Sequence, residues 1–351
     1  MSPARSTKHV LFRPAGSREA ARIMVVAEIG VNHDGDPGRA RELIEAAAAA
    51  GADAVKFQLF RPERLLSSRA ELASYQDGQA EDPGALLAGL TLSGEQMRGL
   101  AAVARAAGLG FWVTPFSLAD VAELEAIGID GVKIASPDAV NTPLLSAATA
   151  LERPMLISTG TCDLEELGPA AEYAQRSGGA LMQCVSAYPT PEKDAGLGGI
   201  AALRARYGGA VGYSDHTAAE DTGALAVAAG ACVLEKHLTY RRDAVGPDHA
   251  ASIEPSGFAR YVAAARRAAV MLGPTEKVCS AIERDVRRVS RQSVCPVVAL
   301  PAGHVLSAED LAVKRPGTGI PANALTQLAG RRLARGVEGD RPLVWDDLEP
   351  V

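Results

Sequence analysis

The chain has 351 residues, of which 47% are hydrophobic and 22% are charged. It is therefore long enough for one large domain and a smaller one, and disorder throughout is excluded. A net charge of −6, from 36 basic and 42 acidic residues, argues against a general binder of nucleic acid or anionic membranes. No apolar run reaches the roughly 18 residues of a transmembrane helix. Five cysteines without a CxxC spacing favour a reducing cytosol over a disulfide framework.

Residues 1–22 form a basic arm without the continuous apolar segment of a signal peptide. Beyond it, short apolar runs alternate with Ala-rich helical patterns. The expected strands are Ile23–Ile29, Ala54–Leu59, Leu109–Thr114, Gly131–Ala135, Pro154–Ser158, Ala180–Cys184, Ala210–Gly212 and Ala231–Glu235. The expected helices span 37–50, 93–107, 118–127, 141–150, 163–177, 197–206, 218–229 and 256–271. Eight such units in about 250 residues predict an α/β fold, a TIM (β/α)8 barrel over residues 23–275. A doubly wound sheet would typically have fewer strands and a glycine fingerprint.

Two segments interrupt this rhythm. Residues 60–92 form a long connection after the second strand, and long loops of this kind often belong to a barrel's active site. Residues 276–293 are polar and indicate a linker. Short β-like runs broken by turns then predict a small β-rich domain over residues 294–351. That domain has 6 basic against 7 acidic residues, so we expect no nucleic-acid role for it.

Polar side chains stand at or just beyond the end of every predicted strand, where barrel enzymes carry their chemistry. They are Glu28, Asn32, Lys56, Gln58, Thr114, Lys133, Ser136, Ser158, Ser186, Tyr188, Ser214, His216, Glu235 and His237. Polar groups at all eight strand ends are hard to explain by packing alone. This face of the barrel is therefore the predicted active site.

Two lysines indicate what the site binds. Lys56 and Lys133 lie in or at the end of apolar strands, where an ammonium group is costly unless it meets an anion. Either lysine alone could equally reach the rim or pair with a carboxylate. Two of them on one face, among serine and threonine hydroxyls, favour a phosphate or carboxylate site.

Two histidines indicate a metal. His216 and His237 follow neighbouring strands, and each by itself would more often be a hydrogen-bonded core or rim residue. Together, with Glu28 and Asp248 at the same mouth, they favour a catalytic divalent ion such as Mn²⁺, Co²⁺, Fe²⁺ or Mg²⁺. We expect no role for three further histidines, which we assign to surface loops: His33, His249 and His304. Cys184 has no evident neighbouring base, so we expect a buried and inert thiol.

These residues lie in strings that resemble the sialic acid synthases. The strings are AEIGVNHDGD (27–36), GADAVKFQLF (51–60), VTPFS (113–117), KIAS (133–136), ISTG (157–160), YPTP (188–191), GYSDHT (212–217), EKH (235–237) and GPDHAASIEP (246–255). The tail string VALPAGHVLSAEDLAVKRPGTGI (298–320) resembles the small antifreeze-like (SAF) domain that ends members of this family. The resemblance runs in order from Val25 to Glu349.

The resemblance implies an enzyme that condenses phosphoenolpyruvate (PEP) with an N-acetylated amino sugar. It implies PEP contacts from Lys56, Thr114, Lys133, Ser136, Ser158, Ser186 and Ser214, with His216 and His237 as ligands of a divalent metal, Mn²⁺ foremost. It implies sugar contacts from Glu28, Gln58, Asp138, Tyr188 and Asp248. Arg315 would reach from the SAF domain into the barrel of a partner subunit, in a domain-swapped homodimer.

The chain departs from the family pattern at two of these positions. Ser186 stands where an asparagine is common, which puts that PEP contact in doubt because serine has a shorter reach and a single donor. Asp138 stands where a glutamate is common, so the acid is retained on a shorter side chain. The GPDH string resembles sialic and legionaminic acid synthases more than pseudaminic acid synthases and so favours a manno-type amino sugar.

The mechanism expected from this resemblance is metal-assisted attack of C3 of PEP on the sugar aldehyde, with loss of phosphate by C–O cleavage. Glu28 is the expected proton carrier, with His216 and His237 holding the metal. Two alternatives stay open. One is a Schiff-base aldolase using Lys133 or Lys236, and the other is a carbohydrate-binding barrel without turnover. The sugar could also be another aldose of a specialised pathway.

Overall fold

The computed structural model describes residues 23–67, 83–273 and 276–350. The N-terminal arm and residues 68–82 of the long connection lie outside these ranges. The chain divides into two compact units, 1–275 and 276–351. None of the helices in the described ranges has the length and apolar character needed to cross a membrane.

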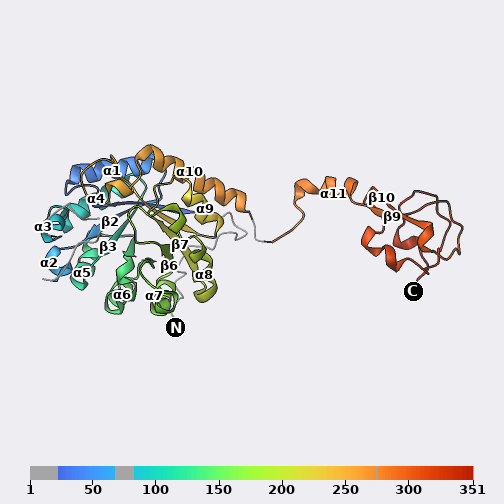
Figure 1. Ribbon diagram of the computed structural model, residues 1–351, viewed down its shortest axis with the longest axis horizontal. Coiled ribbons are helices and arrows are strands. Elements are labelled where there is room, and N and C mark those ends of the chain that lie inside the picture. Colours follow the sequence, from blue (N-terminus) through green and yellow to red (C-terminus); the bar gives the residue numbers. More distant parts are fainter. Residues whose placement is uncertain (1–22, 68–82, 274–275, 351) are drawn as a thin grey trace, which may run out of the picture. The chain divides into compact units, whose positions relative to one another are not determined.

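The first unit is a closed barrel of eight parallel strands (Figure 1). Its strands are β1 (Met24–Gly30), β2 (Ala54–Leu59), β3 (Gly110–Pro115), β4 (Gly131–Ile134), β5 (Met155–Ser158), β6 (Ala180–Cys184), β7 (Ala210–Asp215) and β8 (Val233–His237). Each strand pairs with the next, and β8 returns to pair with β1. The predicted TIM barrel is confirmed. β7 and β8 run further along the chain than the sequence pattern indicated, to Asp215 and His237.

Helices follow the strands, and most of them cover the outside of the barrel (Figure 1). They are α1 (Pro37–Ala49), α2 (Pro62–Leu65), α3 (Pro83–Ala88), α4 (Gly94–Ala106), α5 (Leu118–Ile127), α6 (Thr142–Thr149), α7 (Gly168–Ser177), α8 (Gly198–Tyr207), α9 (Thr222–Ala228) and α10 (Pro255–Leu272). Side chains that accept from backbone N–H groups fix several starts, such as Ser93 with Gln96 in a capping box at α4. The left-handed residue Gly128 ends α5.

Alternate residues of each strand face the interior of the barrel, so successive inward residues lie at different depths. The side chains described here form two layers. The lower layer is apolar and consists mainly of Val26, Ala54, Trp112, Leu156, Met182 and Val233. Two residues further along the same strands, the buried side chains are Glu28, Lys56, Thr114, Ser158, Cys184 and Glu235. The strands therefore close the floor with hydrocarbon and present polar groups above it.

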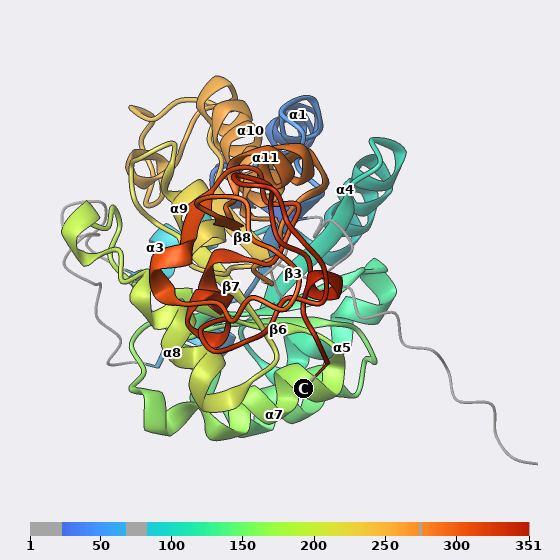
Figure 2. The ribbon, with the colours of Figure 1, turned by 90° about the vertical axis from the view of Figure 1, so that its right-hand side faces the viewer.

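The second unit is small and built mostly from turns (Figures 1 and 2). β9 (Ser293–Pro296) pairs antiparallel with β10 (Leu311–Lys314), and short 3-10 turns surround them. A core of its own includes Val294, Ile320 and Leu333. The predicted linker carries a short helix, α11 (Arg284–Ser290), that the polar composition of this segment did not indicate.

Candidate active site

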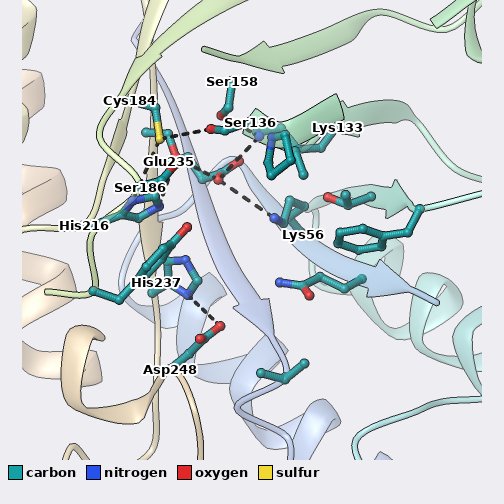
Figure 3. Close-up of a pocket in the computed structure, with 18 of the residues that line it drawn as sticks. Lys56, Lys133, Ser136, Ser158, Cys184, Ser186, His216, Glu235, His237 and Asp248 are labelled. Carbon is teal, nitrogen blue, oxygen red and sulfur yellow. Dashed lines mark hydrogen bonds and ion pairs between the residues drawn. The ribbon is translucent and has the colours of Figure 1, made fainter. Parts of the chain in front are cut away.

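A cavity of about 410 Å³ lies at the carboxyl ends of the barrel strands (Figure 3). The predicted site residues that line it are Lys56, Gln58, Thr114, Lys133, Ser136, Ser158, Ser186, Tyr188, Ser214, His216, His237 and Asp248. Leu87 of α3 lines it as well, so the long connection after β2 contributes to the site. The barrel brings together in one hollow side chains that are almost 200 residues apart in sequence.

The two predicted lysines are buried in this cavity and share the carboxylate of Glu235, which the sequence analysis placed at a strand end without assigning it a role. Glu235 Oε1 lies 3.9 Å from Lys56 Nζ and 4.0 Å from Lys133 Nζ, and Figure 3 shows it between them. Ser214 donates a hydrogen bond of 3.1 Å to the same oxygen. The period of two along a strand agrees with this position, because a residue two before His237 faces the same side.

Each lysine has a further partner. Lys133 Nζ donates to Ser158 Oγ at 2.6 Å and to the Ile134 carbonyl at 2.9 Å. Lys56 Nζ lies 2.8 Å from Glu28 Oε1. These contacts hold both ammonium groups in fixed directions, and the hydroxyl groups around them add neutral donors.

Burial and mutual charge set the protonation of these groups. Burial lowers the pKa of Lys133. It acts the same way on Lys56, but Glu235 and Glu28 raise the pKa of that lysine above its ordinary value. For Glu235, burial is outweighed by Lys133 and Lys56, which lower its pKa. Glu235 is therefore a carboxylate, flanked by two lysines, at the wall of the cavity.

Several polar atoms of the cavity are buried without a hydrogen-bond partner among the described residues. They are Thr114 Oγ1, Glu235 Oε2 and His237 Nδ1. Such orphaned groups cost free energy in a folded protein and are rare. Gathered around one cavity, they indicate donors and acceptors held ready for a bound molecule.

The two predicted metal ligands lie side by side. The ring centroids of His216 and His237 are 5.4 Å apart. Nδ1 of His216 donates to the Val185 carbonyl at 2.8 Å, which leaves the lone pair on Nε2 when this ring is neutral. Burial and the charge of His216 hold the pKa of His237 well below its ordinary value, so that this imidazole is neutral. Its Nδ1 lies 3.6 Å from Asp248 Oδ2.

This donor set fits a catalytic ion better than a structural one. Within the described ranges no group of three or more His, Cys, Asp or Glu side chains forms a metal site. Two imidazoles, one with an orphaned nitrogen and the other fixed by a carbonyl, offer two ligands and leave other positions open to substrate and water. The residues present therefore fit an exchangeable divalent ion.

Cys184 differs from the expectation of an inert thiol without a base. Its Sγ lies 3.8 Å from His216 Nδ1 and 3.6 Å from Ser136 Oγ. Burial opposes the charged form, but His216 lowers the pKa of the thiol to about 7. The sequence gives no direct sign of this neighbour, because His216 comes from the end of the adjacent strand.

Glu28 and Asp138 do not line the cavity. The Glu28 carboxylate is fully buried behind Lys56 and Gln58, which donates to Glu28 Oε1 at 2.9 Å. Asp138 is half-buried in the turn after β4 and accepts from Asn141 Nδ2 at 2.9 Å. Arg315 is exposed on the second unit. Whether a strand-end side chain reaches the cavity depends on the side chains of neighbouring strands. Its position at a strand end alone does not predict this.

Two histidines expected on surface loops are buried. His33 is 1% exposed and His249 is 0% exposed. His33 packs against the ring of Phe57, with ring centroids 6.0 Å apart. His249 makes side-chain contacts from both ring nitrogens. The expectation was wrong because their loops fold back over the barrel, so that long-range contacts cover them.

Comparison with known proteins agrees with this geometry. The model of the NeuB family matches residues 43–277, and that of the SAF domain matches residues 291–349. The chain belongs to the NeuB family. The sequence-based resemblance and the small C-terminal domain are thereby confirmed.

Several relatives of this NeuB-family chain carry synthase names. It is 36% identical to the N,N'-diacetyllegionaminic acid synthase of Legionella pneumophila, over 96% of this chain and 97% of that protein. It is 30% identical to the N-acetylneuraminate-9-phosphate synthase of Mus musculus, over 93% of this chain and 92% of that one. These relatives therefore match the chain across both of its units.

Solved structures extend the match to the fold. The N-acetylneuraminic acid synthetase of Leptospira borgpetersenii, solved with citrate, has a TM-score of 0.69 at 30% identity, over 78% of this chain and 95% of that one. A putative spore coat polysaccharide biosynthesis protein E from Chromobacterium violaceum has a TM-score of 0.77 at 28% identity, over 94% of this chain and 100% of that one.

Proposed function

We propose that the cavity condenses phosphoenolpyruvate with an N-acetylated amino sugar and water, giving a nine-carbon 2-keto sugar acid and phosphate. The observation that carries this proposal is the pair of buried lysines among hydroxyls, with two histidines in the same hollow. The synthase names of the relatives favour a product of the sialic or legionaminic type. The sugar is accordingly N-acetylmannosamine or a 2,4-diacetamido-trideoxy hexose.

PEP is assigned to the lysine side of the cavity. Lys56 and Lys133 carry the positive charge that a phosphate and a carboxylate need. The hydroxyls that would complete this anion site belong to Thr114, Ser136, Ser158, Ser186 and Ser214. Because both ammonium groups are fixed in direction, they would hold PEP with its C3 facing the sugar. This alignment lowers the entropic part of the activation barrier.

The metal is assigned to His216 and His237, with Mn²⁺ preferred and Mg²⁺ or Co²⁺ possible on the same donors. When bound, the ion would act as a Lewis acid toward the carbonyl oxygen of the sugar. Gln58, Tyr188 and Asp248 line the remaining wall and are assigned to the sugar. The half-buried Asp138 could contact the sugar only after a local change in its turn.

The proposed chemistry forms one carbon–carbon bond. C3 of PEP attacks the aldehyde carbon, the aldehyde oxygen gains a proton and becomes a hydroxyl, and water adds at C2. Collapse at C2 leaves a ketone and releases phosphate with cleavage of the C2–O bond. Glu235 is the lining carboxylate that lies next to both lysines, and it is assigned to accept the proton of the water. Glu28 acts behind it, on the charge of Lys56.

A panel of N-acetyl amino sugars with PEP, assayed for phosphate and product mass after chelator treatment and again with added Mn²⁺, tests this proposal. We expect phosphate and a nine-carbon acid in equal amounts, restored by Mn²⁺ after stripping. Lys133→Met should abolish both, because the anion site loses a buried charge. Undiminished turnover of the stripped enzyme would exclude the metal, and no coupling with any sugar would exclude the reaction.

A Schiff-base aldolase is the second candidate, because burial lowers the pKa of Lys133 at the wall of the cavity and a neutral amine is the nucleophile that such enzymes need. Lys236 does not serve this role, because its Nζ lies 3.1 Å from Asp215 Oδ2 and outside the cavity lining. Reduction with borohydride in the presence of substrate would trap an adduct on Lys133 only if this alternative holds.

A further inference from the structure

Two segments meet at the sugar side of the barrel mouth. One is the turn of residues 31–36 after β1, and the other is the segment of residues 238–253 after β8, which carries Asp248. The Leu238 amide donates to the Glu28 carbonyl at 2.8 Å and joins the two at their base. Both lie in strings singled out in the sequence, yet the proposed reaction uses neither Asp34 nor His249.

A buried imidazole links these segments. His249 Nε2 donates to Asp34 Oδ1 at 2.8 Å, and His249 Nδ1 lies 2.7 Å from Thr239 Oγ1. Tyr240 donates to the other oxygen of Asp34 at 2.9 Å, and Arg39 forms an ion pair with that oxygen. One carboxylate of the β1 turn thus holds two residues of the β8 segment.

A second path runs to the backbone of Asp248. Asn32 Nδ2 donates to Ser252 Oγ at 2.8 Å and to the Leu238 carbonyl at 2.9 Å. Ser252 Oγ in turn donates to the Asp248 carbonyl at 2.6 Å. The carbonyl of Asp248 and the imidazole of the next residue are therefore both tied to the β1 turn.

The turn before His249 is built around its ring. A Cβ placed on Gly246 would lie 2.7 Å from His249 Cδ2, closer than van der Waals contact permits. The backbone of the GPDH string can therefore approach the imidazole only because it has a glycine there. The carboxylate of Asp248 then lies at the cavity wall, 3.6 Å from His237 Nδ1.

The order Asp34, His249, Thr239 has the form of a hydrolase triad, but the geometry gives it no nucleophile. Thr239 is 0% exposed and is absent from the lining of the cavity. Its hydroxyl also lies 3.1 Å from the Arg241 carbonyl, to which it donates. A group that cannot meet substrate does not attack one, so the contact must act through what it holds in place.

We propose that the hydrogen bond between Asp34 and His249 positions Asp248 for the amino sugar, which makes Asp34 and His249 specificity-determining residues outside the cavity. The inference rests on the assignment of Asp248 to the sugar under the proposed function. Neither residue touches the lysine side of the cavity, so the contact should affect the sugar and leave PEP unaffected.

Asp34 allows a clean set of variants because its φ is 51°, in the left-handed region. Glycine and asparagine both adopt this conformation without strain. Asp34→Gly removes the acceptor, whereas Asp34→Asn keeps an oxygen that accepts from His249. Tyr240→Phe is the matched control, because it removes one of the other hydrogen bonds to the same carboxylate and leaves the one from His249.

The experiment combines steady-state kinetics with hydrogen exchange of the full-length protein. We expect Asp34→Gly to raise the KM for the amino sugar about 10-fold, with the KM for PEP unchanged, and to speed amide exchange in residues 244–254. Asp34→Asn and Tyr240→Phe should match the wild type in both measurements. A purely structural role would instead move both KM values together and would overturn the proposal.

The two failures can be told apart. If the wild type couples PEP to no amino sugar, the proposed function fails, and the exchange measurement alone decides whether Asp34 holds the Asp248 turn. Exchange in residues 244–254 that is the same in Asp34→Gly and wild type would overturn the positioning role, whatever the activity.

Discussion

At the scale of the residue, Lys56 stands between two carboxylates with different titration behaviour. Glu235 stays charged because both lysines lower its pKa. Burial raises the pKa of Glu28 to about 7, although Lys56 at 2.8 Å acts against this rise. Near neutral pH the charge balance around Lys56 therefore depends on Glu28, which sits behind the lysine and outside the cavity lining.

This arrangement predicts how PEP binding depends on pH. Below about 7 Glu28 is protonated and neutral, and Lys56 is freer to attract an anion. As pH rises through that value the carboxylate forms and competes with PEP, so the KM for PEP should rise. Glu28→Gln should remove this rise in the KM for PEP. The ionisation of PEP itself affects the variant and the wild type equally, so the comparison isolates Glu28. A rise that persists in Glu28→Gln, measured by initial rates from pH 6 to 8.5, would contradict the assignment.

At the scale of the element, the ends of β7 and β8 present histidines to the cavity on one side and form a buried ion pair on the other. His216, just beyond β7, and His237 at the end of β8 face the cavity. Asp215 and Lys236 each come one residue earlier, and Lys236 Nζ lies 3.1 Å from Asp215 Oδ2. Both residues are buried, with 0% and 1% of their surface exposed. Lys236 Nζ also donates to the Thr217 carbonyl at 2.5 Å. This buried pair fixes the two strand ends that present the histidines.

Removing one partner of the Asp215–Lys236 ion pair should lower the stability of the fold. Lys236→Met leaves Asp215 buried without its cation, and we expect a loss of about 3–5 kcal/mol in the free energy of unfolding. Asp215→Asn combined with Lys236→Met removes both charges and should lose less. Urea unfolding of the full-length variants measures both. Equal losses for the single and double variants would show that the pair is not what stabilises these ends.

At the scale of the whole molecule, the chain joins a barrel to a SAF domain whose own core is small. Arg315 is exposed on that domain. We propose that it completes the sugar site of a partner subunit's barrel in a domain-swapped homodimer.

Mixed dimers test this arrangement. Arg315→Ala should raise the KM for the amino sugar and leave that for PEP unchanged. Lys133→Met should be inactive by itself. In a swapped dimer of the two variants, one site combines an intact barrel with an intact Arg315, so co-expression should restore activity at low sugar concentration. Activity no higher than that of Arg315→Ala alone would mean that each domain serves its own barrel or none.

The sequence predicted the barrel well because its signals are local. Alternation within each strand and the repeat of strand and helix are readable from neighbouring residues, and so are the inward polar positions at strand ends. The burial of His249 was not readable, because it depends on Asp34, 215 residues away. The neighbour of Cys184 and the cover over Glu28 likewise come from adjacent strands, whose side chains meet only in three dimensions.

The most direct test of the proposed reaction uses PEP labelled with ¹⁸O in the bridge between C2 and phosphorus. The labelled PEP is incubated with the accepted amino sugar and Mn²⁺, and the masses of the phosphate and of the sugar acid are measured by mass spectrometry. Condensation with C–O cleavage predicts that the label leaves entirely with phosphate, alongside an unlabelled nine-carbon acid. Label retained in the acid, or phosphate released without a nine-carbon product, would contradict it.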